Sequence, residues 1–476
     1  MKNAAVFDLA LPWNSTLAAP AATQFVLPIP LGERRLVAIG WLALGLAALV
    51  GSGLFSILLV LARTPYVQEL VPVADLFQVA LVVHVDLSVL VWFVALAGML
   101  WTLNGGERWL PLAWAALALA FVGTAFMGVA PFVGHGLPVM SNYVPVLDNR
   151  VFLYGLSVIG AAFALLTFRG LAVPARIGID LHGTGALRFG LNAAAVSGAI
   201  AVLALAWSWY TIPSEFDGKA YYELLFWGAG HVIQFTWTLL MLVAWLWLAT
   251  LVGARVPLTP RMAVLLFAVG LIAVFIAPLI YFSWPIIAPE HSRMLTWLMR
   301  FGGGLAILPM GLAVLVGLAR ASRSDASAQP LRAALVSSMA LFAFGGLIGF
   351  TIQGSDVRIP AHYHGSIVGI TLALMGLVYA LMPRLGFGLP ARRLATLQPY
   401  LYGGGQLLHI IGLMWSGGYG VQRKVAGSEQ ILKTPQEIAG MGLMGLGGLI
   451  AIVGGFLFLV VVSRAMARRG VEDAPA

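Results

Sequence analysis

Long apolar runs separated by short polar stretches dominate this chain. Twelve runs can be recognised, at residues 36–61, 76–102, 109–130, 151–170, 189–211, 221–250, 261–284, 297–319, 332–353, 363–383, 398–416 and 439–463. Most are long enough to cross a hydrocarbon core about 30 Å thick at about 1.5 Å per helical residue. The pattern predicts an all-α fold, a polytopic membrane helical bundle with about twelve transmembrane helices.

Composition excludes a soluble globular protein. Of the 476 residues, 61% are hydrophobic and only 9% are charged. The chain has no cysteine, which excludes disulfides, thiolate metal sites and iron–sulfur clusters. Metal chemistry must therefore use histidine, carboxylate or a bound cofactor. The net charge of +9 indicates no nucleic-acid partner, because basic residues collect in the cytoplasmic loops of membrane proteins.

Basic residues mark alternate loops, which predicts the orientation in the bilayer. If the N-terminus is cytoplasmic, the loops on that side carry Arg108, then Arg169, Arg176 and Arg188, Arg255 and Arg261, Arg320, Arg323 and Arg332, and Arg384, Arg392 and Arg393. This distribution satisfies the positive-inside rule. We expect a bacterial-type inner membrane protein with a cytoplasmic tail at 1–35, one transmembrane catalytic domain at 36–464, and a second cytoplasmic tail at 465–476.

Four histidines fall at one depth, near the outer ends of three predicted spans. They are His84, His231, His362 and His364. Because each helical residue advances about 100°, His362 and His364 point to nearly opposite faces and predict two separate ligand roles. Ionisable residues inside a membrane are candidates for function. Without cysteine, neutral imidazole is the remaining strong ligand for haem iron, copper or non-haem iron.

Three stretches resemble the catalytic subunit of the haem-copper oxidase superfamily. They are LVVHVDLSVLVWF in the second span, LLFWGAGHVIQFTW in the sixth and IPAHYHGSIVGITLALMGLVYALMPRLG in the tenth. The segment Val421–Gln422–Arg423–Lys424 resembles the superfamily's paired basic residues near haem propionates. The second and tenth spans resemble the cytochrome b-containing and nitric oxide reductase branches more than the mitochondrial type.

The resemblance implies a role for each matching residue. His84 and His364 would be the axial ligands of a low-spin haem, and His362 the single protein ligand of a high-spin haem. His231 would bind a non-haem metal, iron or copper, that faces the high-spin haem. Arg423 and Lys424 would neutralise propionates, although two basic residues in an outer loop are otherwise ordinary solvated side chains.

Departures from the superfamily pattern concern this non-haem metal and the oxygen chemistry. Position 235, where oxygen-reducing members often have a tyrosine, is phenylalanine, which has no phenolic hydrogen to give. The superfamily's His-His pair at the end of the seventh span falls near Ser283 and Trp284, which cannot replace two imidazoles. Glu290 and His291 could join His231 only if their loop shifts by about two turns.

Such a set, one carboxylate and two histidines, would suit iron as well as copper. Gln234 lies one turn after His231 and could orient a ligand or a metal-bound species. The alternative for Glu290 and His291 is an ordinary pair in a hydrated loop. Asp86 could hydrogen-bond near His84, and His409, deep in the eleventh span, is expected to bond a neighbouring helix.

Three functions remain open from the sequence. The first is a dihaem nitric oxide reductase-like subunit, in which a high-spin haem and a non-haem metal supply the electrons and no protein radical is required. The second is a terminal oxygen reductase in which a tyrosine outside the expected register does the work. The third is a haem electron-transfer or sensory subunit without the non-haem metal. The chain has neither a cysteine pair nor a CxxCH motif, so we expect an electron-donating partner subunit of cupredoxin or cytochrome c type.

Overall fold

The structure is a computed structural model that describes residues 24–67, 74–134, 136–179, 181–321 and 325–468. Its elements are α1 (Glu33–Leu61), α2 (Ala74–Val85), the π-helical turn η2 (Asp86–Val91), α3 (Trp92–Asn104), α4 (Leu110–Val129), η3 (Ala130–Phe132), β1 (Leu137–Val139), β2 (Val146–Asp148), α5 (Arg150–Ala172), α6 (Gly183–Thr211), α7 (Gly218–Leu251), α8 (Pro260–Ile272), η4 (Ala273–Phe275), α9 (Ile276–Ser283), α10 (Pro289–Trp297), η5 (Leu298–Gly302), α11 (Gly304–Arg320), η6 (Ala326–Ala328), α12 (Gln329–Gly349), α13 (Arg358–Leu381), η7 (Pro383–Leu385), α14 (Arg392–Gly418), η8 (Gly427–Glu429) and α15 (Pro435–Met466).

The predicted all-α membrane bundle is confirmed. Among the described residues, 11 helices are long and apolar enough to cross a membrane. The long helix α14 corresponds to the remaining predicted span. It is less apolar because it contains polar residues, among them Gln398 and His409, which are buried against neighbouring helices. The only sheet in the described residues is the short antiparallel hairpin of β1 and β2.

The helix boundaries differ from the predicted spans most clearly at α10. The sequence places Glu290 and His291 in a loop, but both residues lie in the first turn of α10. Pro289 occupies a position at the helix start where its missing N–H is harmless, and Glu290 complements the positive end of the helix dipole. Together with η5 and α11, this helix forms one span from Pro289 to Arg320.

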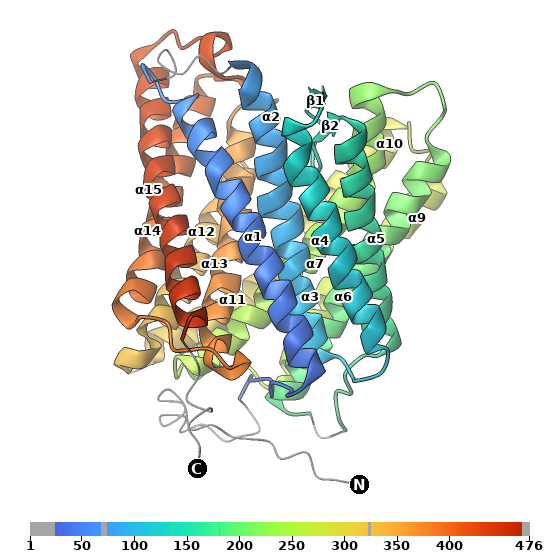
Figure 1. Cartoon of the computed structure of the whole chain (residues 1–476), viewed down its shortest axis with the longest axis vertical. Coiled ribbons are helices and arrows are strands. Elements are labelled where there is room, and N and C mark those ends of the chain that lie inside the picture. The colour runs from blue at the N-terminus through green and yellow to red at the C-terminus, as the bar shows by residue number, and fades with distance from the viewer. Residues whose placement is uncertain (1–23, 68–73, 135, 180, 322–324, 469–476) are drawn as a thin grey trace.

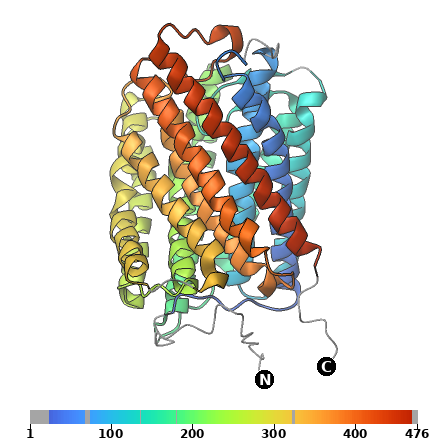
Figure 2. The ribbon, with the colours of Figure 1, turned by 90° about the vertical axis from the view of Figure 1, so that its left-hand side faces the viewer.

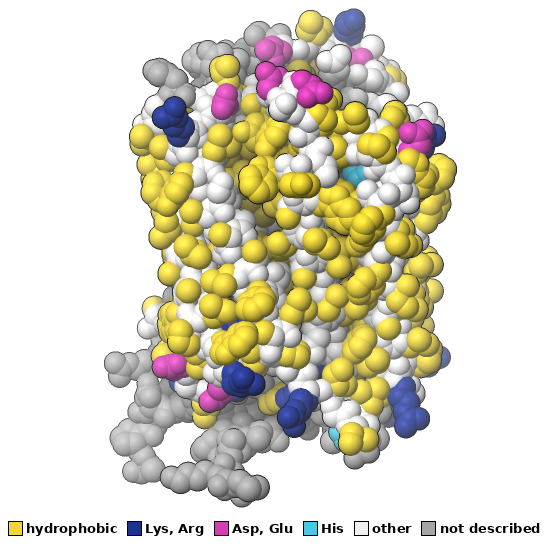
Figure 3. Space-filling model, turned by 90° about the vertical axis from the view of Figure 1, so that its right-hand side faces the viewer, with side chains coloured by type: hydrophobic (Ala, Val, Ile, Leu, Met, Phe, Trp, Pro, Cys, Tyr) yellow, Lys and Arg dark blue, Asp and Glu magenta, His cyan; other side chains and the backbone are white. Residues whose placement is uncertain are grey.

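Both ends of the bundle can be followed in Figure 1. The N-terminal end of α1 and the C-terminal end of α15 lie at the lower end, and the β1–β2 hairpin lies at the upper end. The view in Figure 2 shows α15 crossing the bundle along its length. On the face shown in Figure 3, apolar side chains cover the middle, Lys and Arg gather toward the lower end, and Asp and Glu lie mainly near the upper end.

Small residues let the helices that carry the histidines approach closely. A Cβ added to Gly365 on α13 would lie 2.5 Å from the Gly345 Cα atom on α12. In the same way, a Cβ on Gly447 of α15 would lie 2.6 Å from the Gly405 carbonyl oxygen of α14. Close backbone approach at small residues is a common means of packing membrane helices. It fixes the height of α13 against α12 and of α14 against α15.

We expect Gly447→Ala to lower the free energy of unfolding by about 1–3 kcal/mol, because the added methyl group must push α14 and α15 apart. Gly404→Ala is the matched control, since a Cβ there meets nothing within 4 Å. Alanine favours a helix over glycine by about 1 kcal/mol, so the control should be neutral or stabilising. Thermal unfolding in detergent measures both, and equal midpoints for the two variants would contradict the packing argument.

Candidate functional site

A cavity of about 2250 Å³ runs through the bundle. Three of the predicted ligands line it: His84 from α2, and His362 and His364 from α13. Its volume is more than twice the upper end, about 1000 Å³, of the range for a single small-molecule pocket. Most of the wall is apolar, so a flat hydrophobic cofactor would be shielded from water there. The structure therefore brings three of the four aligned histidines to one space.

His84 is oriented by α1. Its Nδ1 lies 3.0 Å from the Ser52 carbonyl oxygen, which can only accept a hydrogen bond. The Nδ1 atom must carry the proton, so the Nε2 lone pair remains available to a ligand in the cavity. Immediately after this residue the helix widens into η2, and such π-helical turns are frequent at functional sites.

His362 and His364 are held against different neighbours, as their spacing predicted. The Nδ1 of His362 donates to the Gly345 carbonyl oxygen of α12 at 2.7 Å, which again leaves Nε2 free. The ring of His364 lies 4.9 Å from the ring of His409 on α14, measured between centroids. His409 itself donates from Nδ1 to the Met444 carbonyl oxygen of α15 at 2.9 Å. The prediction that His409 bonds a neighbouring helix is confirmed.

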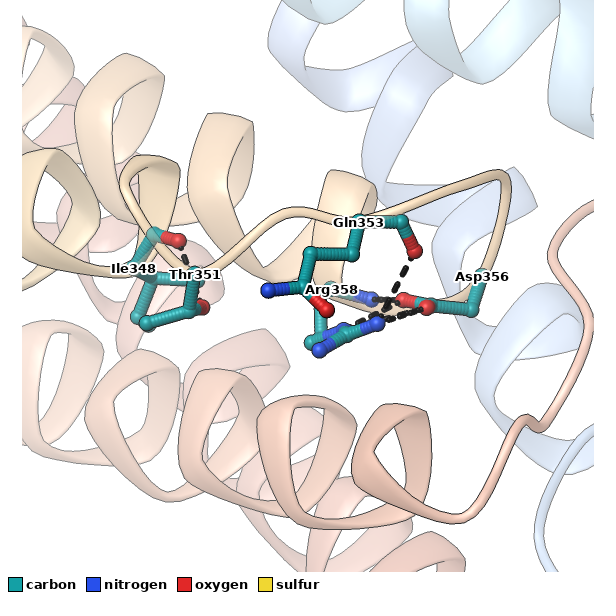
Figure 4. Close-up of polar contacts among 5 residues, drawn as sticks. All are labelled: Ile348, Thr351, Gln353, Asp356 and Arg358. Carbon is teal, nitrogen blue, oxygen red and sulfur yellow. Dashed lines mark hydrogen bonds and ion pairs between the residues drawn. The ribbon is translucent and has the colours of Figure 1, made fainter.

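The start of α13 is held in place by a partly exposed ion pair. Arg358 contacts the Asp356 carboxylate at 2.6 Å and donates to the Gln353 carbonyl oxygen at 2.9 Å, as Figure 4 shows. The backbone N–H of Val357 donates to the Val421 carbonyl oxygen. The two ligand histidines are thereby tied to the loop that carries Arg423 and Lys424.

Basic side chains form the roof of the cavity. Arg423 and Lys424 line it as predicted, and Arg63 joins them from the end of α1. Burial and the nearby Arg423 guanidinium lower the pKa of Lys424 to about 8, and burial lowers the pKa of Arg63 to about 10. An anion bound in the cavity would stabilise the positive charges of both side chains. The sequence interpretation missed Arg63, although a lone arginine directly after an apolar run is a visible signal.

His231 on α7 is placed differently from the other three histidines. It is 2% exposed and does not line the cavity. Its Nδ1 lies 2.7 Å from the Trp227 carbonyl oxygen, and its Nε2 lies 3.0 Å from the hydroxyl oxygen of Tyr143. Gln234 and Phe235 from the same helix do line the cavity. Tyr143 belongs to the loop between β1 and β2, and the sequence interpretation missed it.

The predicted metal set of His231, Glu290 and His291 is not assembled. Glu290 lies on the surface of α10, where it pairs with Arg293 one turn later at 3.0 Å. His291 is buried, with its ring edge-on to Tyr281 at 4.6 Å. Among the residues that the structure describes, no group of three histidine, aspartate or glutamate side chains is placed to hold a metal ion. The α-helical geometry of α10 is the reason, because it turns Glu290 outward.

The residues present fit haem but not a non-haem metal. For haem, His84 and His362 each have an Nε2 free of the backbone bond that orients the ring. The Gln406 side chain also lines the cavity, next to His364. The basic roof suits the carboxylates of haem propionates. For the non-haem metal, by contrast, both ring nitrogens of His231 are hydrogen-bonded, and Glu290 on α10 pairs with Arg293.

Comparison with known proteins agrees with this arrangement. Residues 36–457 match the family described as cytochrome c and quinol oxidase polypeptide I. The chain belongs to this haem-copper oxidase family. Members of the haem-copper oxidase family are oxidoreductases that generally bind haems and a non-haem metal.

Two relatives and one solved structure extend the comparison. The chain is 28% identical to the uncharacterized protein RP382 of Rickettsia prowazekii (strain Madrid E), over 90% of this chain and 95% of the relative. It is also 28% identical to an uncharacterized protein of Aquifex aeolicus (strain VF5), over 73% of this chain and 85% of that relative. A solved haem-copper terminal oxidase dimer shares the fold with a TM-score of 0.73 at 15% identity, covering 94% of this chain and 86% of that one.

The geometry predicts that replacing one histidine of this protein removes the spectrum of one haem and leaves the other. His362→Ala should abolish the high-spin haem spectrum and leave the low-spin spectrum, because His84 and His364 do not depend on the His362 ring. His84→Ala is the matched variant and should have the opposite effect. Optical and electron paramagnetic resonance spectra of the purified proteins measure both. Loss of both haem spectra in His362→Ala, with folding retained, would contradict the assignment.

The low pKa of Lys424 predicts a pH-dependent haem potential. As pH rises through about 8 the ammonium group loses its positive charge, so adding an electron to a nearby haem becomes less favourable and the reduction potential falls. The expected fall is on the order of tens of millivolts, since one charge is lost near the cofactor. A bound propionate would move the inflection to higher pH.

Lys424→Met should remove this inflection and lower the potential below pH 8. Lys433→Met, in the same outer loop but exposed, is the control and should leave the titration unchanged. Spectroelectrochemical titration between pH 6 and 10 measures the effect. If the inflection persists in Lys424→Met, another group titrates there and the prediction is wrong.

Proposed function

We propose that the chain is the catalytic subunit of a dihaem membrane oxidoreductase that reduces nitric oxide to nitrous oxide. His84 and His364 would hold the low-spin haem, and His362 the high-spin haem. The haems, when bound, supply electron storage and an iron atom that binds the substrate. The residues of the chain orient these groups, exclude water with the apolar wall, and balance the propionate charge with Arg423 and Lys424.

The observation that carries this proposal is the apolar side chain at position 235. Phe235 is 4% exposed, lines the cavity, and packs near Gly302 of η5. Cleaving dioxygen in one step needs four electrons, and a phenol at this position would supply one of them. Phenylalanine has no such hydrogen. Two nitric oxide molecules need only two electrons and two protons to give nitrous oxide and water, which suits the side chains present.

Electron entry fits the outer end of the molecule. The low-spin site would lie under the roof formed by Arg63, Arg423 and Lys424, whose positive charges favour anionic groups in the cavity. Because the sequence has no cysteine, the donor would be a separate cupredoxin or cytochrome c type subunit. From there α13 links the two haem sites, since His364 and His362 are two residues apart. The basic loops favour a bacterial-type inner membrane location with the redox site toward the outer face, which is part of this proposal.

Oxygen reduction is the second candidate, and one specific contact favours it. Tyr143 lines the cavity, and its hydroxyl oxygen lies 3.0 Å from the Nε2 of His231. A tyrosine from outside the expected register could therefore supply the phenolic hydrogen that Phe235 lacks. Burial raises the pKa of Tyr143 above its ordinary value, so the phenol retains its proton at physiological pH.

Turnover of the purified holoprotein separates these functions. With an artificial reductant and no oxygen, we expect nitric oxide consumption and nitrous oxide formation in a 2:1 ratio, measured by electrode and gas chromatography. His362→Ala should abolish it while keeping the low-spin spectrum. Vigorous oxygen consumption with little nitric oxide consumption would overturn the proposal in favour of the second candidate. Absence of both turnovers in a haem-loaded protein would instead indicate an electron-transfer or sensory subunit.

A further inference from the structure

The tautomer of His231 follows from its two hydrogen bonds. The Trp227 carbonyl oxygen, 2.7 Å from Nδ1, can only accept, so Nδ1 of the neutral ring carries the proton. Nε2 then presents a lone pair, and the Tyr143 hydroxyl at 3.0 Å donates to it. A metal ion would need this same lone pair, because neutral imidazole binds metals through it. The atom predicted to coordinate a metal is therefore already engaged.

Tyr143 is held in this position by an unusual backbone conformation. Its φ of 66° lies in the left-handed region, which bulky residues rarely adopt and which persists only when surrounding contacts enforce it. The ring fits over Gly230, where any Cβ would overlap it. It also lies 4.9 Å from the His231 ring and edge-on to Trp227 at 5.9 Å, measured between ring centroids. The fit against α7 thus depends on a glycine directly before the histidine.

Contacts from two distant parts of the chain enforce that conformation. The backbone and side-chain amides of Asn142 each donate to one oxygen of Glu223 at 3.0 Å, and Glu223 lies about two turns before His231 on α7. From the opposite side, Lys424 donates to the Met140 carbonyl oxygen at 2.7 Å. Arg423 donates to the Asn142 side-chain oxygen at 3.2 Å. The loop that presents Tyr143 is fixed both to the helix carrying His231 and to the roof of the cavity.

We infer that His231 is the hydrogen-bond acceptor of Tyr143 rather than a metal ligand, and that this tyrosine–histidine pair takes the place of a non-haem metal on the α7 wall. The holoprotein then contains iron only in haem. Tyr143, from the loop between β1 and β2, and Gln234, from α7, then line the cavity that would hold the high-spin haem. The inference rests on the two-haem site of the proposed function but not on the choice of substrate.

The nearest alternative ligands do not complete a metal site. Glu290 faces away and pairs with Arg293. His291 is a buried imidazole whose Nε2 has no hydrogen-bond partner among the described residues, so it is the side chain that could join His231 if Tyr143 moved away. Two imidazoles would still fall short of the ligand sets that hold iron or copper firmly. A decisive test must therefore include His291 as well as His231.

Metal content is the first measurement. The holoprotein would be equilibrated anaerobically with Cu(I) or Fe(II), desalted, and analysed by mass spectrometry for metals against haem determined optically. We expect iron equal to haem and only substoichiometric copper, zinc and non-haem iron, both before and after equilibration. A stoichiometric third metal that is lost in His231→Ala or His291→Ala would overturn the inference. A third metal that survives both substitutions lies elsewhere and leaves the assignment of His231 supported.

The second measurement tests the pair itself. Carbon monoxide bound to the reduced high-spin haem has a stretching frequency that responds to polar groups lining the cavity. We expect Tyr143→Phe and His231→Ala to shift this frequency in the same direction, and the double variant to shift it no further, because each substitution breaks the same hydrogen bond. Independent, additive shifts, or no shift in Tyr143→Phe, would overturn the pairing.

Controls keep both measurements interpretable. Tyr222→Phe removes a hydroxyl group from α7, the helix that carries His231. The Tyr222 ring stacks on Phe226, so this substitution should leave the carbon monoxide frequency unchanged. The low-spin haem spectrum reports folding in every variant, because it depends on His84 and His364. Neither measurement requires turnover. If the protein does not reduce nitric oxide, the expected metal content and vibrational shifts are unchanged. Failure of the proposed function can therefore be distinguished from failure of the inference about His231.

Discussion

The hydrogen bond from His362 Nδ1 to the Gly345 carbonyl oxygen fixes the His362 ring against α12. It forms because Gly345 and Gly365 let α12 and α13 touch through their backbones. A carbonyl in the middle of a helix has a spare lone pair, so it orients an imidazole without losing its own helical bond. His84 and His409 are oriented by the same means. Backbone oxygens thus set the directions of the His84, His362 and His409 rings.

Much of the bundle, and the helices that carry the three histidines of the cavity, could be predicted from the sequence. Apolar runs separated by polar loops report membrane spans directly, and two histidines spaced i and i+2 must diverge on a helix. For this reason His84, His362 and His364 were placed correctly on their helices. The same reasoning failed at α10, because a helix start at Pro289 depends on local capping that the hydropathy pattern does not reveal. Glu290 was consequently expected near a metal, whereas it lies on the surface beside Arg293.

Tyr143 could not be found from the sequence for a different reason. Its left-handed backbone and its position over Gly230 depend on Glu223, Arg423 and Lys424, which are remote in sequence. Periodicity describes one segment at a time and carries no information on such contacts. Family resemblance did not help either, since it directs attention to position 235 on α7. The three histidines that line the cavity thus match the family resemblance, whereas the α7 wall depends on contacts with this chain's own loops.

The roof contacts also constrain the order in which the protein is assembled. Arg423 and Lys424 reach residues that are 281 and 284 positions earlier in the sequence. The loop between β1 and β2 is therefore synthesised long before the cations that fasten it. During biogenesis this loop therefore lacks both contacts until residues 423 and 424, which follow α14, have been made.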